Sequence, residues 1–253
     1  ISEQISVFQS AMASAERVFG LLDEAPEPDL ESGREFTGLN NEIEFRNLNF
    51  SYNSDKQVLK DLSFTIKKGE RIAVVGHTGA GKTTLAALLK RFYDYQDGQI
   101  LIDGVDLREF SRSSLRRRIG LIQQDVNIFS GTILDNIFLA EGSFDKNKLD
   151  SIISELQMEI LIDKLPQGIE TQIFERGSNI SAGQRQLIAF SRALATDPEI
   201  LILDEATSSV DSETESIIQR SVQQLTSSRT SLIIAHRLST IRNCSRILVL
   251  HNG

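Results

Sequence analysis

A glycine-rich octapeptide has the most specific chemistry in this sequence. Gly76–Thr83 reads G-H-T-G-A-G-K-T, follows the apolar run Ile72–Val75 and precedes a helical pattern of leucines. This is the strand, loop and helix context in which the G-x-x-x-x-G-K-[ST] pattern binds phosphate. Glycine adopts backbone torsions closed to other residues, so successive N–H groups can turn toward a phosphate, and the helix N-terminus adds partial positive charge. The octapeptide therefore predicts a site for a nucleoside triphosphate.

Two side chains of this loop have individual predicted roles. Lys82 is expected to reach the β- and γ-phosphates, and the Thr83 hydroxyl is expected to ligate Mg²⁺. The other residues predicted to contact the nucleotide here are Gly76, His77, Thr78, Gly79, Ala80, Gly81 and Thr84.

A pair of acidic residues follows a second apolar run. Asp204 and Glu205 come directly after Leu201–Leu203, where Asp204 can hold Mg²⁺ through water. Glu205 can polarise an attacking water, and general-base assistance of this kind contributes about 10²–10⁴-fold to a rate. A strand that ends in two acids is often only structural, but behind a phosphate loop the pair predicts hydrolysis.

The apolar pattern predicts the elements that position these residues. Short alternating bursts from Ile43 to Ile66 indicate half-buried antiparallel strands. Continuously apolar runs indicate parallel strands buried on both faces, at Ile72–Val75, Ile200–Leu203, Leu232–Ile234 and Ile247–Leu250. Residues from about 126 to 195 are mostly helical in pattern. The predicted fold class is α/β, with an antiparallel β subdomain and an inserted α-helical subdomain.

The N-terminal part has a different pattern. Apolar residues recur at steps of four and three from Ile1 to Leu22, which predicts an amphipathic helix over residues 1–25. Pro26 and Pro28 end it, and residues 26–41 are expected to be a linker to the main domain at 42–253. The helix either packs on its own domain or meets a partner outside this sequence.

Composition limits the possible functions. The 253 residues include 27 basic and 35 acidic side chains, and a net charge of −8 argues against a nucleic-acid partner. The basic cluster Arg116–Arg118 is more typical of a solvated or subunit-facing surface. One cysteine, Cys244, excludes an internal disulfide. No apolar run approaches the roughly 20 residues needed to span a bilayer, so this chain is expected to be soluble.

A second motif tests which nucleotide is bound. Asn147-Lys148-Leu149-Asp150 matches the N-K-x-D motif with which GTPases read guanine. That motif lies at the end of a buried strand in GTPases, whereas the residues before Asn147 are polar and those after it have a helical pattern. The context therefore opposes GTP.

Ile180-Ser181-Ala182-Gly183-Gln184 resembles the L-S-G-G-Q signature of ATP-binding cassette proteins. It stands shortly before the Asp204 strand, as in that family, and the resemblance covers residues 43–253. The resemblance implies a P-loop NTPase fold with a RecA-like core, an ATPase activity, and ATP and Mg²⁺ as cofactors.

The resemblance also implies roles for four further residues. Tyr52 is similar to the aromatic residue that stacks on adenine, and Gln124 to the glutamine that joins Mg²⁺ to the helical subdomain. His236 is similar to the switch histidine that contacts the γ-phosphate. Asp211, in Ser208–Asp211, is similar to the loop that crosses to the opposite subunit. Taken singly, each has a structural alternative, such as a core tyrosine or a solvated glutamine.

The signature implies a second nucleotide-binding domain as partner. Ser181 can cap a helix whose N-terminus points at an anion, and Gly183 permits close backbone approach. By resemblance, Ser181, Gly183 and Gln184 contact the γ-phosphate of ATP held by the other subunit, in a head-to-tail dimer. Ala182 and Ile180 replace the glycine and leucine of the family pattern. This suggests a heterodimer with one weaker site, although a homodimer is possible.

Three features resemble exporters within that family. Thr171–Gly177 is similar to the loop that ends in Glu-Arg-Gly and touches the membrane domain, and Ala15–Phe19 is similar to the tail of the last membrane-spanning helix. The sequence stops at Gly253, where the family continues into further helix, so a fragment cut at both ends is expected. The prediction is ATP-driven export at the cytoplasmic side of a membrane, together with a transmembrane domain of the same longer chain. The alternatives are an ATP-gated module with weak hydrolysis and a soluble ATPase that acts on nucleic acid.

Overall fold

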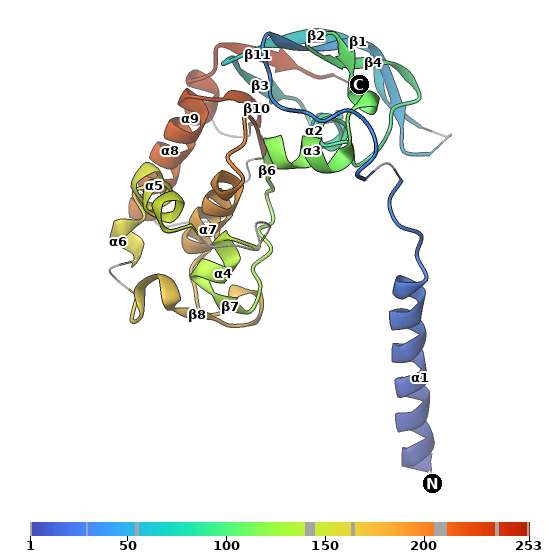
Figure 1. Cartoon of the computed structure of the whole chain (residues 1–253), viewed down its shortest axis with the longest axis vertical. Coiled ribbons are helices and arrows are strands. Elements are labelled where there is room, and N and C mark those ends of the chain that lie inside the picture. The colour runs from blue at the N-terminus through green and yellow to red at the C-terminus, as the bar shows by residue number, and fades with distance from the viewer. Residues whose placement is uncertain are drawn as a thin grey trace. The chain divides into compact units, whose positions relative to one another are not determined.

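A computed structural model of the chain describes residues 2–28, 30–53, 56–139, 145–162, 165–204, 212–235, 238–251 and 253. The chain divides into two compact units, Ile1–Leu30 and Glu31–Gly253. Figure 1 shows the elements of both units.

The first unit contains one helix, α1 (Ser2–Leu22). Its apolar side chains Ile5, Phe8, Met12 and Phe19 are each more than half exposed. The helix ends at Leu22, before Pro26, whereas the prediction extends it over residues 1–25. In the described parts of the chain, no helix combines the length and the apolar character that crossing a membrane requires.

The central sheet of the second unit is parallel, with strand order β11-β3-β10-β9-β6. Its strands are β3 (Arg71–Val75), β6 (Ile119–Ile122), β9 (Ile200–Asp204), β10 (Thr230–Ile234) and β11 (Arg246–Val249). The predicted parallel strands are therefore present. The prediction of burial on both faces is wrong for β11, because Ile247 is 49% and Val249 is 69% exposed. Among the described strands, β11 lies at the sheet edge and pairs with β3 alone, so fewer neighbours cover it.

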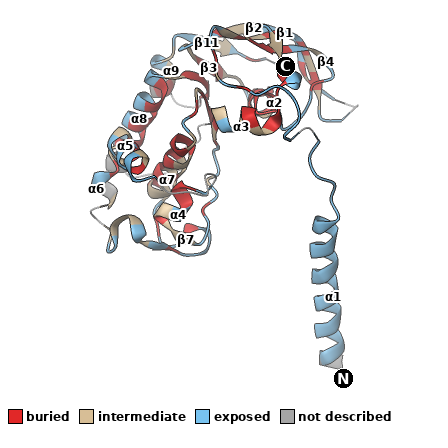
Figure 2. Ribbon diagram, in the orientation of Figure 1, coloured by how far each residue is buried: buried red, intermediate tan, exposed pale blue. Residues whose placement is uncertain are grey.

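The two faces of the central sheet contribute to two separate cores. Ile202 and Leu232 pack in a core with leucines of α2 (Lys82–Leu89) and with the antiparallel sheet. Leu203 and Ile233 point the other way, into a core formed with the helices α5 (Lys146–Leu156), α7 (Ala182–Ala195) and α8 (Ser212–Ser227). Figure 2 shows buried residues on the helices on that side. Burial on both faces explains why these strands are continuously apolar rather than alternating.

An antiparallel sheet of order β2-β1-β4-β5 covers the first core. Its strands are β1 (Glu42–Ser51), β2 (Gln57–Lys67), β4 (Asp97–Ile102) and β5 (Val105–Asp106). Phe45 of β1 and Phe64 of β2 face each other in the register, and their rings stack with centroids 4.3 Å apart. The antiparallel strands predicted between Ile43 and Ile66 are thus confirmed.

The remaining elements are mostly helical. Between residues 126 and 195 lie β7 (Gly131–Thr132), α4 (Ile133–Ile137), α5 (Lys146–Leu156), α6 (Glu159–Ile162), β8 (Gln172–Ile173) and α7 (Ala182–Ala195). Three 3-10 turns are η1 (Leu107–Glu109), η2 (Gly168–Glu170) and η3 (Glu175–Gly177). The other helices are α3 (Arg112–Arg118), α8 (Ser212–Ser227) and α9 (Leu238–Arg242).

The segment from Glu31 to β1 is a packed part of the second unit. Phe36 and Leu39 are only 3% and 1% exposed, within the residues expected to be a linker. The Asp103 carboxylate accepts the backbone N–H groups of Asn40 and Asn41 at 2.7 Å each, and that of Glu42 at 3.1 Å. From Glu31 onward the chain is thus part of the folded domain, because two large apolar side chains are buried there.

Asp103→Asn is expected to lower the free energy of unfolding by about 1 kcal/mol, because a neutral amide accepts these N–H groups less strongly. Burial acts to raise the pKa of Asp103, but the three N–H groups and the Asn40 side chain outweigh it, so this pKa is lowered. The stabilisation is therefore present above the unfolded pKa of about 3.9 and is lost as the pH falls through the lower folded value.

Urea unfolding of both chains from pH 7 down to pH 3 measures this difference. Asn is the suitable replacement because Asp103 has a φ of 51°, which Asn tolerates. Asp150→Asn, on the exposed side of α5, is the matched control and should change stability by less than about 0.5 kcal/mol. A difference for Asp103→Asn that does not shrink at acid pH contradicts the role of the charge.

Candidate nucleotide-binding site

The phosphate loop connects β3 to α2 and needs glycine for its shape. Gly79 and Gly81 have φ values of 82° and 99°, in the left-handed region that other residues rarely adopt. A Cβ atom on Gly81 would also lie 2.6 Å from the Leu59 side chain of β2. The loop therefore passes close under β2, in the strand, loop and helix context that the sequence predicts.

The Lys82 side chain closes this loop by hydrogen bonding to its first residues. Its ammonium donates to the backbone carbonyls of Gly76 at 2.8 Å and His77 at 3.1 Å, and the residue is only 7% exposed. The Lys82 side chain thus folds back over the start of the loop. This arrangement places a positive charge where the phosphates of a nucleotide would lie.

Two oxygen side chains from distant parts of the chain meet beside the loop. The Thr83 hydroxyl, in the first turn of α2, donates to the Asp204 carboxylate at 3.2 Å. Asp204 is the last residue of β9, and Gln124 follows β6 and lines the same cleft. Hydroxyl, carboxylate and amide oxygens are hard ligands of the kind that Mg²⁺ prefers, so the donor set fits that ion.

The cleft around these residues has a volume of about 980 Å³. Ten predicted site residues line it: Tyr52, His77, Thr78, Gly79, Gly81, Lys82, Thr83, Thr84, Gln124 and Asp204. Gly76 and Ala80 support the loop without lining the cleft, and Ala80 is fully buried. Four residues that were not predicted also line the cleft, from β2 and the residue before it: Lys56, Gln57, Val58 and Lys60. They lie within the Ile43–Ile66 stretch for which antiparallel strands are predicted, four to eight residues after Tyr52, and this position was the available signal.

Tyr52 lies just beyond the end of β1 and is 46% exposed. Its hydroxyl donates to the Thr84 hydroxyl oxygen at 3.2 Å. The ring is nearly perpendicular to the rings of Phe50 and Tyr93, with both centroids 4.9 Å away. The alternative of a core tyrosine is wrong, because the side chain is open to solvent at the cleft.

The signature residues form the start of α7. The Ser181 hydroxyl oxygen accepts the Gln184 N–H at 3.2 Å, and the Gln184 side-chain oxygen accepts the Ser181 N–H at 2.7 Å. This capping box confirms the predicted helix cap at Ser181. The contribution of Gln184 was missed, although the S-x-x-Q spacing could have revealed it. Within the described part of the chain, none of the residues that line the cleft belongs to the signature.

Three predicted site residues, Glu205, Asp211 and His236, lie outside the described residues. Their roles therefore stay predictions.

The guanine-reading alternative is not supported by the fold. The Asp145 carboxylate accepts the N–H groups of Asn147 and Lys148, which makes Asp145 the N-cap of α5. Asn147–Asp150 thus forms the first turn of a helix, whereas a guanine reader follows a buried strand.

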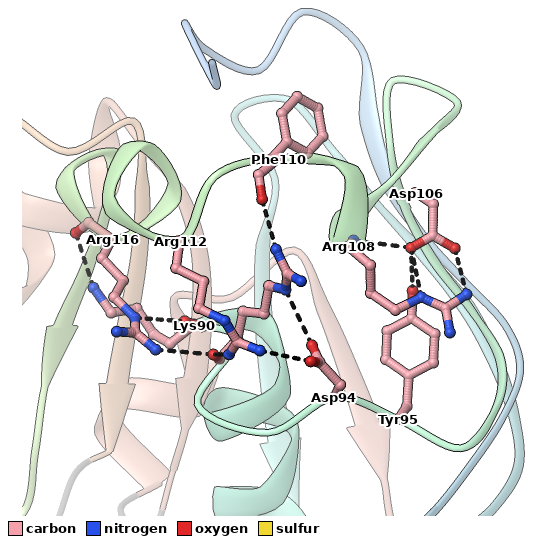
Figure 3. A network of polar contacts seen from close by, with 9 residues as sticks. Lys90, Asp94, Tyr95, Asp106, Arg108, Phe110, Arg112 and Arg116 are labelled. Carbon is pink, nitrogen blue, oxygen red and sulfur yellow. Dashed lines mark hydrogen bonds and ion pairs between the residues drawn. The ribbon is translucent and has the colours of Figure 1, made fainter. Parts of the chain in front are cut away.

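Arg116, the first arginine of the basic cluster before β6, has structural contacts. Arg116 donates to the Lys90 and Arg91 carbonyls, and its guanidinium lies 5.1 Å from the centre of the Phe92 ring. Lys90 in turn donates to the Arg116 carbonyl at 2.9 Å (Figure 3). It also donates to the Ile119 carbonyl at 2.6 Å. Burial, and to a lesser extent Arg116, lowers the pKa of Lys90 to about 8. These contacts tie the end of α2 to β6 and give Arg116 a structural role, whereas Arg117 is exposed.

The parallel sheet, the lysine-closed loop and the Thr83–Asp204 pair define a P-loop nucleotide-binding domain. Comparisons with known proteins narrow this class. The sequence profile of the family described as ABC transporter matches residues 59–208. The chain belongs to the ABC transporter family, and it is an ATP-binding, ATP-hydrolysing part of such a protein.

Two curated relatives are similar in sequence to nearly the whole chain. A probable multidrug resistance ABC transporter ATP-binding/permease protein of Bacillus subtilis (strain 168) is 46% identical over 253 residues, which are 100% of this chain and 37% of the relative. A fatty acid ABC transporter ATP-binding/permease protein of Mycobacterium tuberculosis (strain CDC 1551 / Oshkosh) is 46% identical over 248 residues, which are 98% of this chain and 39% of the relative.

A solved structure of a bacterial Atm1-family ABC exporter with ATP bound is similar with a TM-score of 0.82 and 38% identity, over 96% of this chain and 42% of that chain. The predicted α/β fold and the predicted family are thereby confirmed. The chain spans less than half the length of these relatives.

Proposed function

We propose that the longer protein to which this chain belongs uses ATP to export a substrate across a membrane, with this chain at the cytoplasmic side. The observation that carries the proposal is the Thr83–Asp204 contact of 3.2 Å beside the lysine-closed loop, because it assembles a metal and phosphate site. The similarity to ATP-binding/permease proteins and to an exporter supports the direction and the membrane partner.

Different residues are assigned to the phosphates, the adenine base and the metal ion. Lys82 neutralises the β- and γ-phosphates, and Tyr52, which lines the same cleft, stacks on adenine. Thr83, Gln124 and Asp204, the last through water, would hold Mg²⁺. Held there, Mg²⁺ would supply positive charge against the negative charge that develops on the phosphates during transfer.

Two residues outside the described ranges complete the proposed chemistry. Glu205 follows Asp204 directly in sequence and is assigned the role of polarising the attacking water. His236 is assigned a contact with the γ-phosphate. Both assignments rest on the order of the motifs.

The proposed partner is a second nucleotide-binding domain arranged head to tail. The capping box holds the Ser181 hydroxyl and the Gln184 amide at the N-terminus of α7, where an anion is favoured. With Gly183, these groups would meet the triphosphate of the partner, and Asp211 would lie in the loop that crosses between subunits. We favour a heterodimer because Ala182 adds a methyl group to the signature, and a homodimer remains the competing arrangement.

The export proposal is tested with the full-length protein in lipid vesicles that expose its ATP-binding part. A cationic dye and a long-chain fatty acid are suitable first substrates, because two relatives are named for multidrug resistance and for fatty acids. We expect one of them to accumulate inside only with ATP and Mg²⁺, and Asp204→Asn to abolish the accumulation.

Two outcomes of this experiment separate the parts of the proposal. ATP hydrolysis that responds to neither compound and drives accumulation of neither contradicts export of these classes. Full transport by the protein alone, with two equivalent ATP sites, shows a homodimer and removes the heterodimer.

A further inference from the structure

The Tyr52 side chain is held in place although it is half exposed and lies beyond its strand. Its hydroxyl is bound by Thr84 in the first turn of α2 at 3.2 Å. Its ring has two perpendicular neighbours, the buried Phe50 and the half-exposed Tyr93. Perpendicular aromatic pairs at this separation are attractive beyond the area that they bury. Tyr93 does not line the cleft itself, so any effect of Tyr93 on a nucleotide would pass through Tyr52.

The backbone just before Tyr93 has a defined end-of-helix geometry. The Arg91 N–H donates to the Leu88 carbonyl and the Phe92 N–H to the Ala87 carbonyl, each at 2.9 Å. Together with a φ of 52° at Arg91, these bonds form a Schellman motif at the end of α2. Glycine usually occupies the left-handed position of this motif, so an arginine here accepts some backbone strain.

The side chains on both sides of Tyr93 anchor that turn. Arg91 donates to the Phe110 carbonyl at 2.6 Å and to the Asp94 carboxylate at 3.0 Å. Arg112 donates to the other Asp94 oxygen at 2.6 Å, and Figure 3 shows this bridge at the end of α2. Arg91 and Arg112 are only 3% and 4% exposed. Tyr93 is thus fixed between two anchored neighbours, which explains how an exposed ring can hold a defined position.

We propose that Tyr93 is a positioning residue that holds the Tyr52 ring as a preformed platform for adenine. The inference deepens the proposed function and rests on the stacking role of Tyr52. Thr84 stands at the start of α2 and Tyr93 just beyond its end, so one helix sets the position of Tyr52 relative to the phosphate loop. A preformed platform avoids the entropy cost of ordering the side chain when ATP binds.

Equilibrium binding of Mg·ATP and of inorganic tripolyphosphate to the 253-residue chain tests this role. Tyr93→Ala is expected to weaken ATP binding about 3- to 10-fold, the equivalent of one aromatic contact. Tripolyphosphate has no base to stack on Tyr52. Tyr93→Ala should therefore change its affinity by less than about twofold, as expected when the phosphate and base contacts are independent. Tyr93→Phe keeps the ring and should restore ATP binding to within about twofold of the unchanged chain.

A double-mutant cycle separates positioning from a general structural effect. Tyr52→Ala should weaken ATP binding at least as much as Tyr93→Ala. Adding Tyr93→Ala to Tyr52→Ala should then cost less than about a further twofold, because Tyr93 acts only through Tyr52. Thermal unfolding checks that each variant folds, and Tyr93→Leu, which retains apolar volume without a ring, replaces Tyr93→Ala if the latter does not.

Each contrary outcome has one meaning. Equal weakening of ATP and tripolyphosphate by Tyr93→Ala, or losses that multiply in the double variant, overturn the positioning role and leave the proposed function intact. Unchanged ATP binding by Tyr52→Ala instead removes the stacking role of Tyr52, and the inference about Tyr93 falls with it.

Discussion

Glu205→Gln is expected to lower the rate of ATP hydrolysis by the full-length protein at least about 100-fold, with little change in ATP affinity. The amide has nearly the shape of the carboxylate but cannot polarise the attacking water in the same way. The phosphate loop, with Lys82 and Thr83, is unaltered, so binding is retained. Steady-state hydrolysis and equilibrium ATP binding of the same preparation measure the two effects separately.

A matched control is available for this substitution. Glu109→Gln makes the same chemical change on an exposed residue of η1, and it should leave turnover within about twofold, as is usual for surface positions. Near-normal hydrolysis by Glu205→Gln would remove Glu205 from its role. A loss of ATP binding as large as the loss of turnover would instead indicate damage to the loop.

Lys82→Ala is expected to weaken Mg·ATP binding to the 253-residue chain by about 30-fold or more, because truncating one partner of a partly buried charge pair costs about 2–5 kcal/mol. The change also removes the donor that holds the Gly76 and His77 carbonyls at 2.8 and 3.1 Å. The substitution thus acts both on the charge and on the shape of the loop. Titration calorimetry with Mg·ATP measures the affinity.

Lys60→Ala tests whether ATP binding needs a lysine at the position of Lys82 or only a positive charge somewhere in the cleft. Lys60 also lines the cleft but lies on the exposed side of β2, and its removal should weaken binding less than about threefold, since screened surface charges contribute little. Equal losses for Lys60→Ala and Lys82→Ala are incompatible with a specific lysine in the phosphate loop.

Much of the fold follows from local patterns. The parallel strands at Ile72–Val75 and Ile200–Leu203 and the helix cap at Ser181 lie where the sequence predicts them. These features depend on neighbours within a turn or a strand, such as an apolar period or a capping side chain. Interactions of such short range leave a visible pattern in the residues themselves.

The errors have a common cause. Phe36 and Leu39 are buried although their segment has the composition of a linker, and Ile247 is exposed although its strand is continuously apolar. Burial depends on which element lies opposite a side chain, and that depends on strand order and layer packing. Composition over a few residues does not contain this information.

The residues Gly76–Thr83 by themselves determine that this protein binds phosphate, because the torsions and N–H groups that form the loop lie within eight consecutive residues. Only the tertiary structure decides that Thr83 meets Asp204, 121 residues later, because the order of β3, β10 and β9 brings those strand ends together. The tertiary structure also decides that Tyr52 lies outside the core and that its ring contacts Tyr93. That contact depends on how the antiparallel sheet packs against α2.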